Sequence, residues 1–201
     1  QQIIDFYKLY MILTRQRLQK LVEHVLSPTQ YGFRPAKSTS HAIYIIRRIQ
    51  EFAESTGNEL YMTLLDWEKA FDKEDYDCLC SALARFGIHE GIIEALRDCY
   101  SKATFFVKDQ FGNSEKKSQL SGIRQGCPLS PYLFVIVMTC VEFDIKKLLT
   151  PPITNHRVPG INFDMVYYAD DTIIVSTKME ACKKLVEYTE KVSAHYGLKL
   201  N

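Results

Sequence analysis

Two adjacent carboxylates lie between two apolar segments near the end of the sequence. Asp170 and Asp171 follow Met165–Tyr168 and precede Thr172–Ser176, so the pattern predicts a β-hairpin with both acids at its tip. Two like charges at such short range repel each other, and a divalent cation would relieve this repulsion. For the dipeptide alone, an ordinary solvated Asp-Asp turn is the alternative interpretation.

A third carboxylate, Asp66, directly follows the apolar run Leu60–Leu65. Because polar and apolar residues do not alternate in this run, we predict a central strand that is covered on both faces. Asp66 lies 104 residues before Asp170, so only the tertiary fold can bring the two together. Carboxylates that converge on two Mg²⁺ ions catalyse in-line phosphoryl transfer. For Asp66 alone, a residue that merely ends a strand is the alternative.

A loop rich in glycine and proline, Gly122–Pro131, precedes a long apolar segment. Gly126 would let a planar ligand approach the backbone closely. Ser130 could cap the helix that follows. The alternative interpretation is a plain loop at the entrance of a helix.

A second loop, Tyr31–Thr39, offers two cations ahead of a predicted helix, for which Ser38 or Thr39 is the expected cap. Arg34 and Lys37 could clamp a triphosphate, because a guanidinium and an ammonium both bind phosphate oxygens. A surface turn explains this segment equally well.

The elements that must position these residues follow from hydrophobic periodicity and from Gly and Pro stops. Besides the strands already named, we predict a first hairpin over residues 104–108 and 114–119, around Phe111-Gly112-Asn113. Strands and helices without strict alternation predict an α+β fold. The predicted helices span residues 4–26, 39–55, 75–86, 90–101, 130–149 and 179–196.

Length and composition exclude several classes of protein. With 201 residues, of which 46% are hydrophobic and 24% charged, the chain is one globular domain or two small intertwined ones rather than a disordered segment. The longest apolar run, Tyr132–Val141, is too short to span a membrane. Six scattered cysteines without a C-x-x-C pair predict reduced thiols in an intracellular protein and argue against a zinc module.

Charge is distributed unevenly along the chain. Residues 1–50 carry a net charge of +6, and residues 51–100 carry −8. This asymmetry suits a site that holds a polyanion on one surface and divalent cations on another, although solvated helix faces explain it as well. The total of +1 argues against an autonomous nucleic-acid binder.

Taken together and in this order, the segments resemble the polymerase motifs of reverse transcriptases, above all those of non-LTR (LINE-type) retrotransposons and more distantly those of group II introns. Leu65–Asp72 resembles motif A of that family, Gly122–Pro131 resembles motif B, and Tyr168–Asp171 matches its Y-x-D-D motif C. Gly197–Asn201 resembles the start of motif D, and Tyr31–Thr39 resembles the fingers motif upstream of motif A. The resemblance covers nearly the whole chain.

The resemblance implies a catalytic centre for RNA-directed DNA synthesis. Asp66 and Asp170 would bind two Mg²⁺ ions, which Mn²⁺ could replace, with help from the Leu65 carbonyl and Asp171 as a further ligand. One metal ion would lower the pKa of the primer 3′-hydroxyl, and the other would steady the triphosphate and the leaving pyrophosphate. Phe71 matches the steric gate that selects deoxynucleotides, with core packing as the alternative.

The resemblance also implies which residues would contact the incoming nucleotide. Gln125 and Gly126 would shape the pocket for this nucleotide and the template base, while Arg34 and Lys37 would contact its triphosphate. Asp72 and Lys199 are further candidates without an assigned role.

The family's architecture is a right-hand polymerase, in which an antiparallel palm sheet with packed helices joins a fingers region. By resemblance, residues 1–58 form truncated fingers, 59–73 the palm with motif A, 74–124 the connecting helices and hairpin, and 125–201 the rest of the palm. We expect the chain to be a fragment that lacks the thumb and an endonuclease domain.

The expected partners are an RNA template, a DNA primer and dNTPs, with no membrane, in the cytoplasm or the nucleus. Two alternatives stay open at this point. One is a catalytically silent retroelement remnant that only binds RNA. The other is an RNA-dependent RNA polymerase, although that class usually carries Gly-Asp-Asp where this chain has Ala169-Asp170-Asp171, and a smaller or polar group where Phe71 stands.

Overall fold

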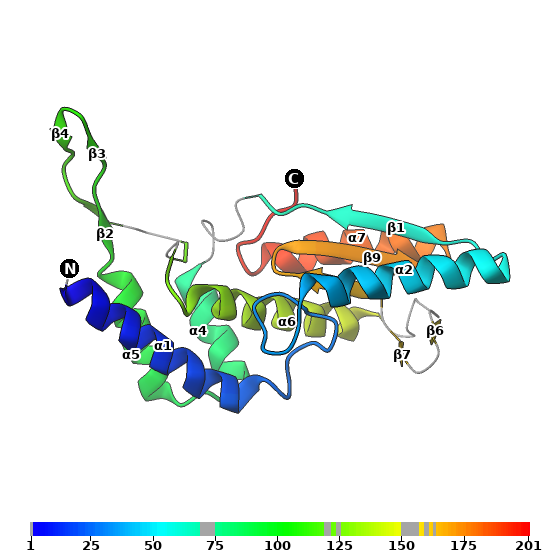
Figure 1. Cartoon of the computed structure of the whole chain (residues 1–201), viewed down its shortest axis with the longest axis horizontal. Coiled ribbons are helices and arrows are strands. Elements are labelled where there is room, and N and C mark those ends of the chain that lie inside the picture. The colour runs from blue at the N-terminus through cyan, green and yellow to red at the C-terminus, as the bar shows by residue number, and fades with distance from the viewer. Residues whose placement is uncertain are drawn as a thin grey trace.

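A three-stranded antiparallel sheet packed against helices organises the chain (Figure 1). The computed structural model describes residues 2–68, 75–118, 122–123, 126–149, 157–158, 161–162 and 164–201. The helices are α1 (Gln2–Val22), α2 (Thr39–Thr56), α4 (Tyr76–Arg85), α5 (Glu90–Ser101), α6 (Ser130–Leu148) and α7 (Met179–Ala194). The strands are β1 (Tyr61–Leu65), β2 (Thr104–Phe105), β3 (Lys108–Asp109), β4 (Gly112–Asn113), β5 (Lys117–Ser118), β6 (Arg157–Val158), β7 (Ile161–Asn162), β8 (Met165–Tyr168) and β9 (Asp171–Ser176).

The main sheet has the order β1-β9-β8, and both of its pairings are antiparallel. The predicted α+β class is therefore confirmed. The prediction that the strand ending at Leu65 is central and covered on both faces is wrong, since β1 is an edge strand and the Leu64 side chain is 76% exposed. Continuous apolar sequence arises here because one face of β1 lies in the main core, while the other opens onto a groove beside α2.

The two faces of the sheet take part in different cores because side chains alternate along a strand. Met165 and Tyr167 of β8 lie in the main core, which also contains α6 and α7 residues. Val166, between them, packs with Ala42 and Ile49 of α2 in a smaller cluster. Helix α7 lies against β9 and β1, whereas α2 runs along the opposite face beside β8 (Figure 1).

Helix α6 forms the centre of the main core. The ten residues from Tyr132 to Val141 are each at most 2% exposed, so this stretch of the helix is buried on all sides. Such burial explains why the stretch is apolar apart from Thr139 rather than amphipathic. Its predicted cap is wrong: Ser130 is the first helical residue, Leu129 precedes it as the N-cap, and the Ser130 hydroxyl lies 3.3 Å from that of Tyr100 instead.

Helix α1 ends at Val22, four residues before the predicted end. Residues 23–25 form turns instead, and the carbonyl of Glu23 accepts a hydrogen bond from Arg34 Nη2 at 3.1 Å. Leu21 and Val25, which fitted the predicted apolar face, are 51% and 39% exposed. The local periodicity therefore does not continue as a helix beyond Val22.

The predicted first hairpin is confirmed in kind, but its turn lies at residues 110–111. It contains two short ladders, β2–β5 and β3–β4, and it projects away from the rest of the chain (Figure 1). Asp109 Oδ1 accepts hydrogen bonds from the amides of Phe111 and Gly112 and thereby closes the turn.

All six cysteines are free thiols, and four of them are buried. Within the described residues, no helix combines the length and the hydrophobicity that are needed to cross a membrane.

An ion-pair network joins three helices of the core. Arg85 of α4 donates two hydrogen bonds to Asp144 of α6, at 2.7 and 2.8 Å, and the Tyr196 hydroxyl, just beyond α7, donates to the same carboxylate at 2.5 Å. These bonds, chiefly those from Arg85, lower the pKa of Asp144. The network connects elements that are distant in sequence.

We expect Asp144→Asn to lower the free energy of unfolding by about 1 kcal/mol at neutral pH, because the pair is partly exposed and screened. A lowered folded-state pKa stabilises the protein above the ordinary carboxyl pKa, and this contribution is lost as the pH falls through the lowered value. Urea unfolding from roughly pH 5 to pH 2 should therefore show the wild type and the variant converging. An equal difference at both ends of that range would contradict this assignment.

Candidate active site

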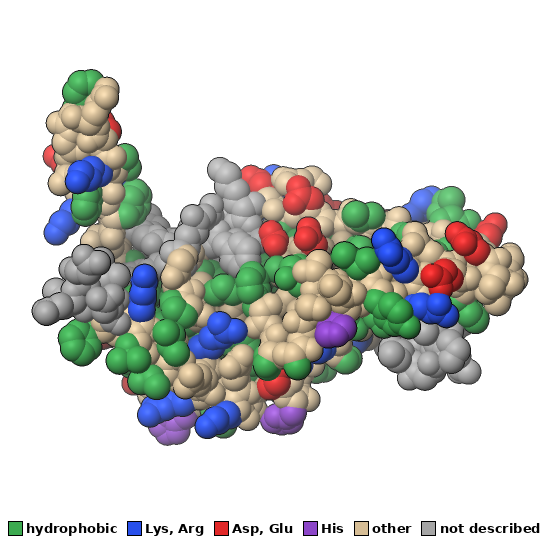
Figure 2. All heavy atoms as spheres, in the orientation of Figure 1, with side chains coloured by type: hydrophobic (Ala, Val, Ile, Leu, Met, Phe, Trp, Pro, Cys, Tyr) green, Lys and Arg blue, Asp and Glu red, His purple; other side chains and the backbone are tan. Residues whose placement is uncertain are grey.

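The strand register brings Asp66, Asp170 and Asp171 to one end of the main sheet. Leu65 pairs with Thr172, so Asp66 and Asp171 are the next residues on neighbouring strands. Tyr168 pairs with Asp171, which leaves Ala169 and Asp170 as the two-residue turn. The prediction that both acids lie at the tip is thus only half right, because Asp171 is the first residue of β9. On the face shown in Figure 2, acidic side chains gather around this end of the sheet.

These carboxylates have the exposure and the charge environment of a cation site. Asp66 and Asp171 are exposed and Asp170 is half-buried, and none of them forms an ion pair with a described Lys, Arg or His. Among the described residues, no three His, Cys, Asp or Glu side chains form a ready-made metal cluster. Mg²⁺ does not require one, since it is usually bound by one or two carboxylates together with waters and substrate phosphates. The donor set therefore fits Mg²⁺, and its ligation stays a prediction.

The turn that carries Asp170 is supported from β1 through a tryptophan. Trp67, 4% exposed, donates from Nε1 to Thr172 Oγ1 at 3.1 Å. The Thr172 hydroxyl in turn lies 3.5 Å from the Asp170 carbonyl oxygen. The residue that follows Asp66 thus connects the end of β1 to the turn.

The loop before α2 supports the same turn from the β8 side. The amide of Tyr31 donates to the Tyr167 carbonyl at 2.8 Å, and the Tyr167 amide donates to the Thr29 carbonyl at 3.0 Å. Gln30, 1% exposed, uses its side-chain amide to bind the backbone of Ala169. Sequence reasoning assigned no role to Gln30, because nothing in a polar loop residue indicates a partner 139 positions away.

The C-terminal segment pairs with the residues that follow β1. Asn201 Nδ2 donates to Asp66 Oδ2 at 2.6 Å, and its backbone amide donates to the Asp66 carbonyl. Lys199 Nζ lies 3.3 Å from Glu68 Oε2. Sequence reasoning missed Asn201, while Lys199, noted as a candidate, lies beside motif A.

The two cations of the loop before α2 are engaged within that loop. The Arg34 side chain is 6% exposed, and its Nε donates to Glu23 Oε1 at 2.7 Å. Lys37 Nζ donates to the Pro28 carbonyl at 2.6 Å and lies 4.8 Å from the centre of the Tyr31 ring. Burial is the main cause that lowers the pKa of Lys37 to about 8. These contacts favour a structural role for Arg34, and its contact with a triphosphate stays a prediction.

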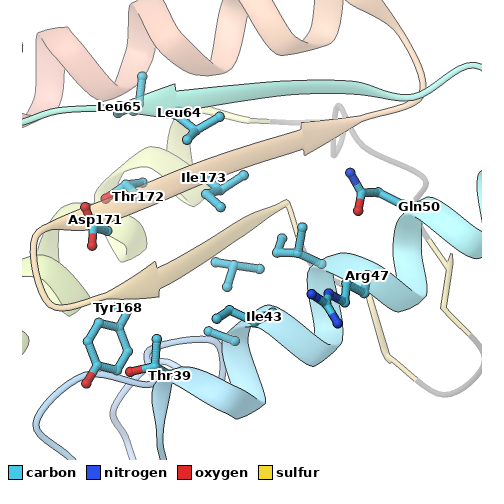
Figure 3. Close-up of a pocket in the computed structure, with 13 residues that line it drawn as sticks. Thr39, Ile43, Arg47, Gln50, Leu64, Leu65, Tyr168, Asp171, Thr172 and Ile173 are labelled. Carbon is cyan, nitrogen blue, oxygen red and sulfur yellow. The ribbon is translucent and has the colours of Figure 1, made fainter.

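A groove lies between α2 and the sheet, next to the acidic end (Figure 3). Its cavity volume is about 480 Å³, within the range of pockets that hold small ligands. Ile43, Leu64 and Ile173 line its apolar middle. Tyr168 and Asp171 lie toward one end of the groove and Arg47 toward the other (Figure 3).

Gly126 adopts a φ of +77°, which favours glycine, and nothing lies within 4 Å of the position that a Cβ would occupy. This open space is compatible with the predicted close approach of a ligand. Two other predicted nucleotide-site residues, Phe71 and Gln125, lie outside the described residues, as does Asp72, the candidate without an assigned role.

Fold and site together define the class of protein. Residues 3–201 match the family model described as reverse transcriptase (RNA-dependent DNA polymerase). The chain belongs to this family, and the resemblance based on its motifs is confirmed.

Its curated relatives are proteins of retrotransposable elements. The "Transposon TX1 uncharacterized 149 kDa protein" of Xenopus laevis is 27% identical over 195 residues, which cover 97% of this chain and 15% of that protein. The Pol polyprotein from the R2DM element of Drosophila melanogaster is 25% identical, covering 87% of this chain and 16% of the relative. The R2 polyprotein of Popillia japonica is 27% identical, covering 85% of this chain and 24% of the relative. The chain thus spans less than a quarter of each of these relatives.

Solved structures confirm the polymerase fold. Telomerase from Candida albicans, solved with a fragment of telomeric RNA, superposes with a TM-score of 0.68 at 15% identity, over 99% of this chain and 33% of that one. The RNA-dependent RNA polymerase of bacteriophage phi12 gives a TM-score of 0.51 at 11% identity, over 81% of this chain and 29% of that one. At these identities the likeness concerns the fold alone. The boundaries between palm and fingers stay a prediction.

Proposed function

We propose that this chain carries the catalytic centre of an RNA-directed DNA polymerase, which adds dNTPs to a primer 3′-hydroxyl within a retrotransposon polyprotein. The observation that carries the proposal is the convergence of Asp66, Asp170 and Asp171 at one end of the sheet in a chain of the reverse transcriptase family. A silent RNA-binding remnant would belong to the same family, but decay usually damages motifs, and here all three acidic positions are filled.

Asp66, Asp170 and Asp171 would hold Mg²⁺ in this proposal, with the Leu65 carbonyl as a further ligand. When bound, two such ions activate the attacking hydroxyl and stabilise charge on the triphosphate and the leaving pyrophosphate. The chain's own contribution is to fix where the carboxylates lie. Trp67 supports the turn from one side, and Asn201 orients the Asp66 carboxylate through its amide.

The incoming nucleotide would lie close to these carboxylates. By family resemblance, Phe71 would exclude a ribose 2′-hydroxyl, and Gln125 with Gly126 would contact the base and sugar. The apolar groove beside Asp171 has room for part of the nucleic acid at this end of the sheet. Arg34 and Lys37 bind Glu23 and the Pro28 carbonyl in this structure, and by family resemblance they would contact the triphosphate once it is bound.

The reaction requires an RNA template, a DNA primer and dNTPs, and by family resemblance a thumb and an endonuclease domain of the same polyprotein would be further partners. The relatives come from retrotransposable elements and so support the retrotransposon setting, and membership of a family of RNA-dependent DNA polymerases supports an RNA template.

The test uses the full reading frame that contains this chain, with poly(rA) template, oligo(dT) primer and Mg²⁺. We expect incorporation of dTTP that requires both the RNA template and the metal. Incorporation of UTP at an equal rate would instead indicate an RNA polymerase. RNA binding without any Mg²⁺-dependent incorporation would favour the silent remnant.

A further inference from the structure

We propose that Gln30 is a positioning residue, which holds the β8–β9 turn and thereby sets the place of Asp170. The expected effect of Gln30 on kcat rests on the proposed function. That Gln30 holds the turn rests on the geometry alone. Gln30 precedes the segment that resembles a fingers motif, and it is separated from the turn by 139 residues.

The whole side-chain amide of Gln30 is used to bind backbone. Its Oε1 accepts hydrogen bonds from the amide of Ala169 at 3.2 Å and from the amide of Gly32 at 2.8 Å. Its Nε2 lies 3.5 Å from the Ala169 carbonyl oxygen. Gln30 is 1% exposed and Ala169 is 6% exposed, so water does not compete for these bonds.

The turn requires such support because Ala169 has an unfavourable backbone conformation. Its φ is +58°, a left-handed value that brings Cβ close to the following carbonyl oxygen in any residue other than glycine. A backbone of this kind persists only where its surroundings determine it, and such sites often serve function. The hydrogen bonds from Gln30 to the amide and the carbonyl of Ala169 hold this backbone in place. They thereby set the position of Asp170, which is the next residue.

Gln30 can hold the turn because its own backbone is fixed. It forms a parallel bridge with Tyr167 of β8, and Arg34 Nη1 donates to the Gln30 carbonyl at 3.3 Å. The buried Arg34 is thus part of the same support. Gly32 lets the loop approach the turn closely, since an added Cβ at this position would lie 2.2 Å from the Ala169 nitrogen. The loop and the turn therefore touch backbone to backbone, and the Gln30 amide satisfies the polar groups at this contact.

The test compares Gln30→Met with Thr29→Val in the full reading frame. Methionine has a similar length and volume but cannot form the three hydrogen bonds. Thr29 is equally buried in the same loop, yet its hydroxyl contacts Ser27 and not the turn. Gln30→Asn serves as a second variant, because it keeps the amide and shortens its reach by one methylene group. Circular dichroism melts establish that the variants fold.

The first readout is hydrogen–deuterium exchange of peptides that cover residues 165–172. For Gln30→Met we expect exchange at the Ala169 amide to become at least about tenfold faster, because the turn can then open locally. Thr29→Val should leave this amide unchanged, and Gln30→Asn should give an intermediate rate. Unchanged exchange in both Gln30 variants would overturn the proposal.

The second readout separates kcat from KM for the dNTP. We expect Gln30→Met to lower kcat on the order of 10²-fold, since small displacements of a reacting group have effects of this size. KM should change by less than about threefold, because Gln30 is only 1% exposed and so offers no surface to a nucleotide. Faster exchange with an unchanged kcat would overturn the positioning role. If the wild-type protein does not polymerise, the proposed function fails, whereas the exchange result still decides whether Gln30 holds the turn.

Discussion

The Asp170→Asn variant should lose nucleotide addition by about 10³-fold or more. Asparagine keeps the size of the side chain but removes the negative charge at the tip of the turn. Loss of this charge removes several kcal/mol of metal-assisted stabilisation from the transition state, and each 1.4 kcal/mol corresponds to about a tenfold change in rate. The measurement is the rate of primer extension on an RNA template under saturating Mg²⁺ and dTTP.

The matched control for this variant is Asp109→Asn, an aspartate in the turn of the projecting hairpin. Its carboxylate closes a turn through two backbone amides, and an asparagine carbonyl can accept the same bonds. We expect this variant to retain wild-type activity. Asp170→Asn should also melt near the wild-type temperature, because no described residue forms an ion pair with Asp170. Activity within threefold of wild type would show that Asp170 is not a catalytic residue.

Replacing Gly32 with alanine should be the most damaging small substitution in the loop before α2. The added Cβ would lie 2.2 Å from the nitrogen and 2.8 Å from the Cα of Ala169, and both of these are backbone atoms. Neither can move without shifting the turn or the loop, so we expect a loss of about 3 kcal/mol in the free energy of unfolding, the upper part of the range for overpacking. Urea denaturation would measure this loss.

Gly57→Ala provides the control for the Gly32 prediction. Gly57 ends α2 with a φ of +65°, and nothing lies within 4 Å of the position that an added Cβ would take. Alanine there introduces only the left-handed backbone strain, which is about 1 kcal/mol. If the two glycine variants lost equal stability, close packing between the loop and the turn would not be the cause of the Gly32 effect.

Local sequence predicted most elements because periodicity and stop signals act over a few residues. The buried helix from Ser130, the second hairpin and the helix that begins near residue 39 all follow from such patterns. Errors occurred where a distant partner decided the outcome. The edge position of β1 depends on which strands lie beside it.

For the candidate site too, the sequence predicted some features and only the structure showed others. The types and order of Asp66, Asp170 and Asp171 led to the prediction of a two-metal site, and the strand register brings these three residues to one end of the sheet. The sequence could not show that Arg34 is engaged by Glu23, since burial of a cation depends on what folds over it. It also could not show that Asp171 starts a strand, because strand register decides which residues form a turn.

By itself, then, the sequence determined the family of this protein, its α+β class and the acidic residues at its centre, because these depend on side-chain chemistry and local spacing. Only the tertiary structure decided how the centre is held together. The bonds from Gln30 to Ala169, from Trp67 to Thr172 and from Asn201 to Asp66 each join segments more than 100 residues apart. Such pairs form because the closed chain leaves buried polar groups that must be satisfied, and this requirement arises only once the chain has folded.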